Sequence, residues 1–156
     1  MAFRTSVFFF LFSLGASAAT STSECAAKAS GFLEGKLTIW QQRLELQSWK
    51  ITVVMSPASG LKPKTLGNVH WDTEKKTATI RVLDASDYQM ACPAMLQDME
   101  FTLVHELVHL EISSLPRTMA SRGEEEQAVN RITDALLGVG GGAIAHAGLQ
   151  PASSTE

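Results

Sequence analysis

His105-Glu106-Leu107-Val108-His109 is the stretch of this sequence that decides which fold and which chemistry to expect. It has the pattern H-E-x-x-H inside a run of apolar residues that recur at helical intervals. Residues four apart lie on the same face of a helix, so both histidine side chains can reach one tetrahedral cation. Glu106 would lie beside that cation, where a carboxylate can accept the proton of an attacking water. The stretch therefore predicts a Zn²⁺ site with Glu106 as general base.

The surroundings of the motif predict that its helix is buried on most sides. The apolar residues of this segment are Phe101, Leu103, Val104, Leu107, Val108, Leu110 and Ile112. Burying a polar side chain without a partner costs about 2–7 kcal/mol, and an unpaired charge costs more. Two histidines and a glutamate in such a helix therefore need partners, and a shared metal ion supplies one.

A third metal ligand is expected from the glutamates that follow the motif. Catalytic zinc sites usually have three protein ligands, and Glu124, Glu125 and Glu126 open a predicted helix about 15–17 residues after His109. Glu126 is the preferred ligand because Asn130 lies one turn later and could orient it by a hydrogen bond. Glu125 is the alternative, since its helix face continues into apolar residues and also points inward.

With these residues, the sequence resembles the gluzincin metallopeptidases, whose pattern is H-E-x-x-H followed by a glutamate ligand in E-x-x-x-D. The second part corresponds here to Glu126-Gln127-Ala128-Val129-Asn130, with asparagine in place of the aspartate. The order of elements is similar to that of the smallest members, the minigluzincins. This resemblance implies a zinc-dependent peptide-bond hydrolase whose substrate lies extended along an edge strand, for which the candidate is the strand Thr77–Asp84.

The hydrophobic pattern predicts an α+β, zincin-like domain with a small three-stranded sheet and three helices. A flexible Ala19–Glu24 segment is expected before the first helix, and an irregular tail is expected from about residue 138. Trp40 and Trp49 are interpreted as core residues. The expected elements are a helix over about Cys25–Ser48, strands over Trp49–Met55, Leu66–Asp72 and Thr77–Asp84, the motif helix from Pro93 to about Ser113, and a ligand-bearing helix over Glu124–Leu137.

Residues 1–18 have the pattern of a secretory signal peptide. Arg4 supplies positive charge, Val7–Leu14 is a short apolar run, and Ala16-Ser17-Ala18 fits the small-x-small cleavage rule. The apolar run is short for a bilayer span, so no stable membrane anchor is expected. The sequence predicts a secreted or periplasmic protein that is cleaved near Ala18 and leaves residues 19–156 as the peptidase domain.

The two cysteines, Cys25 and Cys92, would then reside in an oxidising compartment. A disulfide between them is the favoured expectation. Two unpaired thiols are one alternative, and Cys25 acting as a latch on the zinc is another.

The composition limits the class of partner. The formal net charge is −3 and no basic stripe is present, which argues against nucleic acid and leaves a protein or peptide substrate. Four residues outside the motif are candidates for stabilising a transition state: Tyr88, Arg117, Arg122 and His146. The competing interpretation is a non-catalytic binding or inhibitory module with a structural zinc. Such a site normally has four protein ligands and no need for Glu106.

Overall fold

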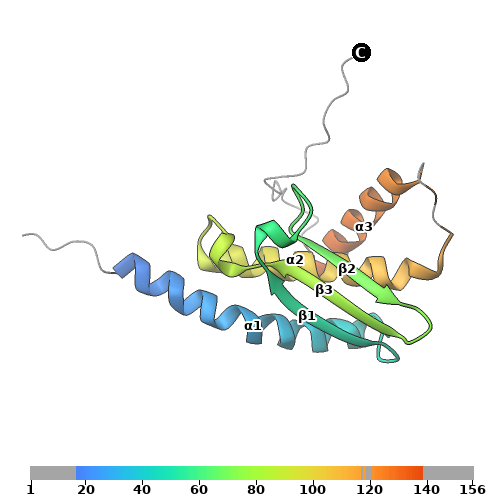
Figure 1. The fold of residues 1–156 in the computed structure, drawn as a ribbon, viewed down its shortest axis with the longest axis horizontal. Coiled ribbons are helices and arrows are strands. Elements are labelled where there is room, and N and C mark those ends of the chain that lie inside the picture. The colour runs from blue at the N-terminus through green and yellow to red at the C-terminus, as the bar shows by residue number, and fades with distance from the viewer. Residues whose placement is uncertain (1–16, 117, 119–120, 139–156) are drawn as a thin grey trace, which may run out of the picture.

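The computed structural model describes residues 17–116, 118 and 121–138. In this part of the chain, three α-helices accompany a three-stranded mixed sheet, which is the α+β organisation expected from the sequence. Figure 1 shows α1 and α2 behind the sheet and α3 against α2. The elements are α1 (Ser17–Arg43), β1 (Lys50–Ser56), β2 (Gly67–Asp72), β3 (Thr77–Leu83), α2 (Cys92–Glu111) and α3 (Arg122–Leu137).

The order of strands in the sheet is β1-β3-β2, which corrects one expectation. The strand predicted over Thr77–Asp84 as the edge for substrate is β3, and it lies in the centre, parallel to β1 and antiparallel to β2. Ala78, Ile80 and Val82 of β3 are buried. A strand that pairs on both sides has no open backbone groups for a peptide, so the exposed edge nearest α2 belongs to β2.

The pairing also shows which backbone groups of β2 face that open edge. Leu83 N–H donates to the Leu66 carbonyl, and residues in an antiparallel pair alternate between facing the partner and facing away. Asn68 and His70 therefore direct their backbone groups toward β3. Gly67, Val69 and Trp71 direct theirs off the sheet, away from β3.

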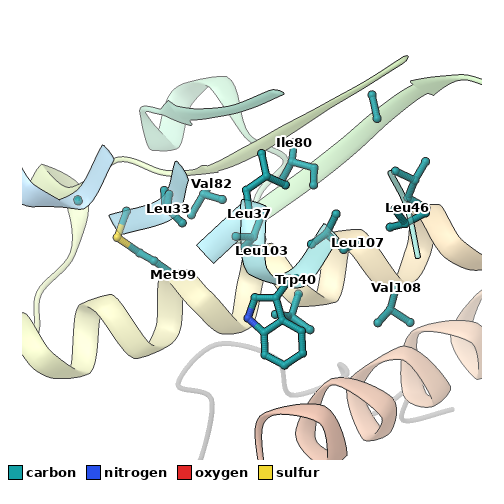
Figure 2. Packing of buried hydrophobic residues seen from close by; sticks show 14 of the residues in the cluster. Leu33, Leu37, Trp40, Leu46, Ile80, Val82, Met99, Leu103, Leu107 and Val108 are labelled. Carbon is teal, nitrogen blue, oxygen red and sulfur yellow. The ribbon is translucent and has the colours of Figure 1, made fainter. Parts of the chain in front are cut away.

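The core lies between the sheet and the pair α1–α2, as Figure 2 shows with side chains from all three. Trp40 and Trp49 are buried, which confirms their assignment to the core. Trp40 also donates its indole N–H to Glu100 on α2, with an Nε1–Oε1 distance of 2.8 Å, and Lys36 forms a 2.7 Å ion pair with the same carboxylate. These polar contacts fix α1 along the side of α2.

A disulfide joins Cys25 to Cys92, so the predicted pairing is confirmed, and the two alternatives for these thiols are wrong. It links α1 to the first residue of α2 across 67 positions of sequence. In the chain-entropy model, closing a loop of this length stabilises the folded state by about 4 kcal/mol. The motif helix is therefore anchored covalently at its start.

Three helix boundaries differ from expectation. The Ala19–Glu24 segment predicted to be flexible is helical, because α1 begins at Ser17, and the helix ends at Arg43 rather than near Ser48. Glu45, with a φ of 54°, has a left-handed backbone conformation that a right-handed helix cannot include. α3 begins at Arg122, two residues earlier than predicted.

The face that α3 turns inward is narrower than its apolar pattern suggests. Val129 and Thr133 are buried, whereas Ile132 and Leu136 are 42% and 38% exposed. α3 therefore packs on α2 along one line of residues. None of the helices in residues 17–116 and 121–138 combines the length and the hydropathy needed to cross a membrane.

Candidate metal centre

α2 places both histidines of the motif on the face that meets α3. Leu103, Val104 and Leu107 are on its core side and are fully buried, which fixes the rotation of the helix. His105 and His109 follow each other at a spacing of one turn, and their side chains are 14% and 10% exposed. The rings lie 4.8 Å apart between centroids, with both Nε2 atoms directed to a common point.

Glu126 completes a group of three possible ligands with the histidines. The two Nε2 atoms are 3.1 Å apart, and each lies 3.4 Å from a carboxylate oxygen of Glu126. Zinc bonds of about 2.0–2.2 Å at tetrahedral angles would place donor atoms roughly 3.3–3.5 Å from one another. The observed separations agree with one small cation bound by two imidazoles and a carboxylate.

Glu125, the alternative third ligand, has a different place. Its Oε1 lies 3.0 Å from Nδ1 of His109, the ring nitrogen that faces away from the common point. A carboxylate bonded to the second nitrogen of a metal-binding histidine fixes the tautomer and the orientation of the ring. The two consecutive glutamates therefore serve one site in two ways, since Glu126 reaches the donor atoms and Glu125 orients His109.

Replacing Glu125 by alanine is expected to weaken zinc binding by about 10–100-fold, which is the usual effect of losing a partner of a metal-binding histidine. Competition with a chromophoric chelator measures the dissociation constant. Glu124→Ala is the matched control, because it removes the same charge from an exposed position in the same helical turn. Equal zinc dissociation constants for the two variants would contradict the role of Glu125.

The carboxylates and imidazoles perturb one another's protonation. Hydrogen bonds to His105 and His109 hold the pKa of Glu126 well below its usual range. Burial opposes the charged form of His109, but its contacts with Glu126, Glu106 and Glu125 outweigh this effect and raise its pKa. The arrangement therefore favours a cation between these groups, because several negatively charged carboxylates lie beside the imidazoles.

Glu106 lies outside the ligand group and on the other side of the histidines, toward the sheet. It is 7% exposed, and burial raises the pKa of its carboxyl, against the opposing charges of His105 and His109. The backbone N–H of Val69 on β2 lies within hydrogen-bonding reach and lowers this pKa. A carboxylate with a raised pKa beside a group of possible metal ligands is suited to accepting a proton.

Of the four residues that could stabilise a transition state, the two that the structure describes do not join this group. Tyr88 lies beside Asp98 and Thr102, in the turns of α2 before the motif, where burial and the charge of Asp98 raise its pKa. Arg122 is exposed at the start of α3, and Arg117 and His146 lie outside the described residues. Within the described chain, Asn130 forms no hydrogen bond with Glu126, so the orienting role expected for it is absent here.

Two contributors to the site were missed by the sequence analysis. Val69 and Gly67 approach Glu106 through the backbone of β2. Only the three-dimensional structure, in which β2 lies next to α2, shows this contact. The order of strands was the missing information, because it decides which strand lies next to α2.

Comparison with known proteins gives no relative for this chain. No protein-family model, curated protein or solved structure matches it.

Proposed function

We propose that this protein is a zinc-dependent metallopeptidase with a zincin-like fold of the gluzincin type. One observation carries the proposal. His105, His109 and Glu126 bring one ligand atom each within 4.8 Å of one another, and the buried Glu106 carboxylate lies next to this group without belonging to it. A structural zinc normally takes four protein ligands, whereas a catalytic zinc takes three and leaves one position open.

The residues divide the chemistry among them. Zinc, when bound, lowers the pKa of a water molecule in its open position toward neutrality. His105, His109 and Glu126 would hold the ion, and Glu125 would keep His109 in the required orientation. The Glu106 carboxylate accepts the proton of the attacking water and passes it to the amine that leaves when the peptide bond breaks.

The open edge of β2 is the proposed place for an extended peptide. Gly67 directs its backbone groups away from β3, and Val69, two residues further along, approaches Glu106. A peptide that adds to this edge as a further strand would bring a main-chain amide over the motif helix. The substrate class is therefore an unfolded protein or a peptide, bound mainly through its backbone.

Secretion, or export to a periplasm, is part of the proposal. It rests on the signal-like pattern up to Ala18, most of which lies outside the described residues. The Cys25–Cys92 disulfide supports this location, because such bonds persist in oxidising compartments.

The test combines metal analysis with an assay for cleavage. The exported protein should contain one zinc per chain and should cut an unfolded protein or a peptide library, with new amino termini identified by mass spectrometry. Removing the metal with a chelator should abolish cleavage, and adding zinc should restore it. Stoichiometric zinc without cleavage would instead favour the binding or inhibitory module, and protein without zinc would exclude both.

A further inference from the structure

The first residue of β2 lies unusually close to α2, next to the side chain of Glu106. A β-carbon built on Gly67 would stand 2.5 Å from Cγ2 of Thr102 and 2.7 Å from the backbone oxygen of Arg81. It would also stand 3.4 Å from Oε1 of Glu106. Carbon atoms in contact are normally about 3.5–4.0 Å apart, so any side chain here would displace the strand by roughly 1 Å.

Neither obstacle is the far end of a long, flexible side chain. The Arg81 oxygen is backbone in the central strand β3, and Thr102 is a β-branched, 5% exposed residue in the middle of α2. β-branched residues in helices have few rotamers available. An added methyl group at position 67 would therefore push the start of β2 away from α2 and β3 together.

We propose that Gly67 is a positioning residue for Glu106: its missing side chain lets β2 approach α2 closely enough for the backbone of Val69 to hold the Glu106 carboxylate beside the two histidines. Thr102 and Glu106 are one turn apart on the face of α2 that meets β2, and Gly67 and Val69 are two residues apart on the same side of the strand. A shift at Gly67 is thus transmitted to Val69. The catalytic meaning of this contact rests on the proposed function, whereas the packing does not.

Zinc binding is separable from this effect. The ligands are on α2 and α3, and β2 supplies none of them. Gly67→Ala should therefore bind zinc within about threefold of the parent, while turnover falls by about 100-fold, the effect of misplacing a reacting group by roughly 1 Å. Thr102→Ser removes Cγ2 and keeps the hydroxyl group, so it should recover part of the turnover in the Gly67→Ala background.

Amide hydrogen exchange at Val69 tests the contact without requiring any activity. The Val69 N–H faces away from β3, so no strand protects it from exchange. The Glu106→Ala variant therefore gives the reference exchange rate of this amide without the carboxylate. We expect Gly67→Ala to exchange at that faster rate and the added Thr102→Ser to slow exchange again. Gly123→Ala, whose β-carbon would meet nothing within 4 Å, is the control and should exchange as the parent does.

An unchanged Val69 exchange rate in folded Gly67→Ala would overturn the proposal. If that variant does not fold, Thr102→Ile enlarges the side chain that faces Gly67 and should accelerate exchange at Val69. A parental exchange rate in Thr102→Ile would also overturn the proposal. A parent protein without peptidase activity would defeat the proposed function alone, because the exchange measurements still decide the role of Gly67.

Discussion

Glu106→Gln is expected to reduce turnover by about 10²–10⁴-fold while zinc binding and folding are retained. Glutamine has nearly the same shape as glutamate but cannot accept a proton, so general-base assistance is lost. Glu106 is not one of the three grouped ligands. Burial raises the pKa of its carboxyl, which means that the charged form is disfavoured at this position, and a neutral amide should be tolerated.

The measurement is kcat on a cleavable peptide, with zinc content and the free energy of unfolding determined on the same samples. Glu111→Gln is the matched control, since Glu111 ends the same helix at an exposed position. Parental turnover in Glu106→Gln would remove Glu106 as the base. Loss of zinc in this variant would instead make Glu106 a ligand and contradict the arrangement described above.

The second large effect is expected when one of the three possible metal ligands is removed. His105→Ala and Glu126→Ala should each lose stoichiometric zinc, because two remaining donors cannot define a tetrahedral site. The stabilisation that metal binding gives to the native state should disappear as well. Thermal unfolding with and without zinc is the measurement, and both variants should show little difference between the two conditions.

Glu124→Ala controls for the loss of charge near the start of α3. The zinc dissociation constant should be largest for Glu126→Ala, intermediate for Glu125→Ala and close to that of the parent for Glu124→Ala. A reversed order for Glu125 and Glu126 would assign the ligand to Glu125. Full zinc retention in His105→Ala would end the metallopeptidase interpretation.

Local patterns in the sequence predicted the elements of the fold well. The helical spacing around His105 identified α2, and the alternation over Trp49–Met55 identified β1, because side-chain periodicity depends only on local geometry. The pairing of Cys25 with Cys92 followed from the even number of cysteines and from the predicted export of the chain. Each of these predictions requires no knowledge of how distant segments pack.

Relations between distant segments were beyond reach of the sequence. Strand order is one example. β3 follows β2 in the chain, but β1 also pairs with β3, so β3 is the central strand and not an edge. The division of roles between Glu125 and Glu126 is another. Both are acidic residues in one helical turn, and only the placement of α3 against α2 shows that one reaches Nδ1 of His109 and the other reaches both Nε2 atoms.

The Cys25–Cys92 bond also determines what happens to a chain that is nicked. All three strands and most of α1 lie inside the covalent ring that this bond closes, whereas the three grouped ligands lie beyond it. After a single backbone cut within the ring, for instance in the exposed turn Thr73–Lys76, the disulfide still joins the two pieces. A protease that makes this first cut thus leaves the sheet tethered to α2.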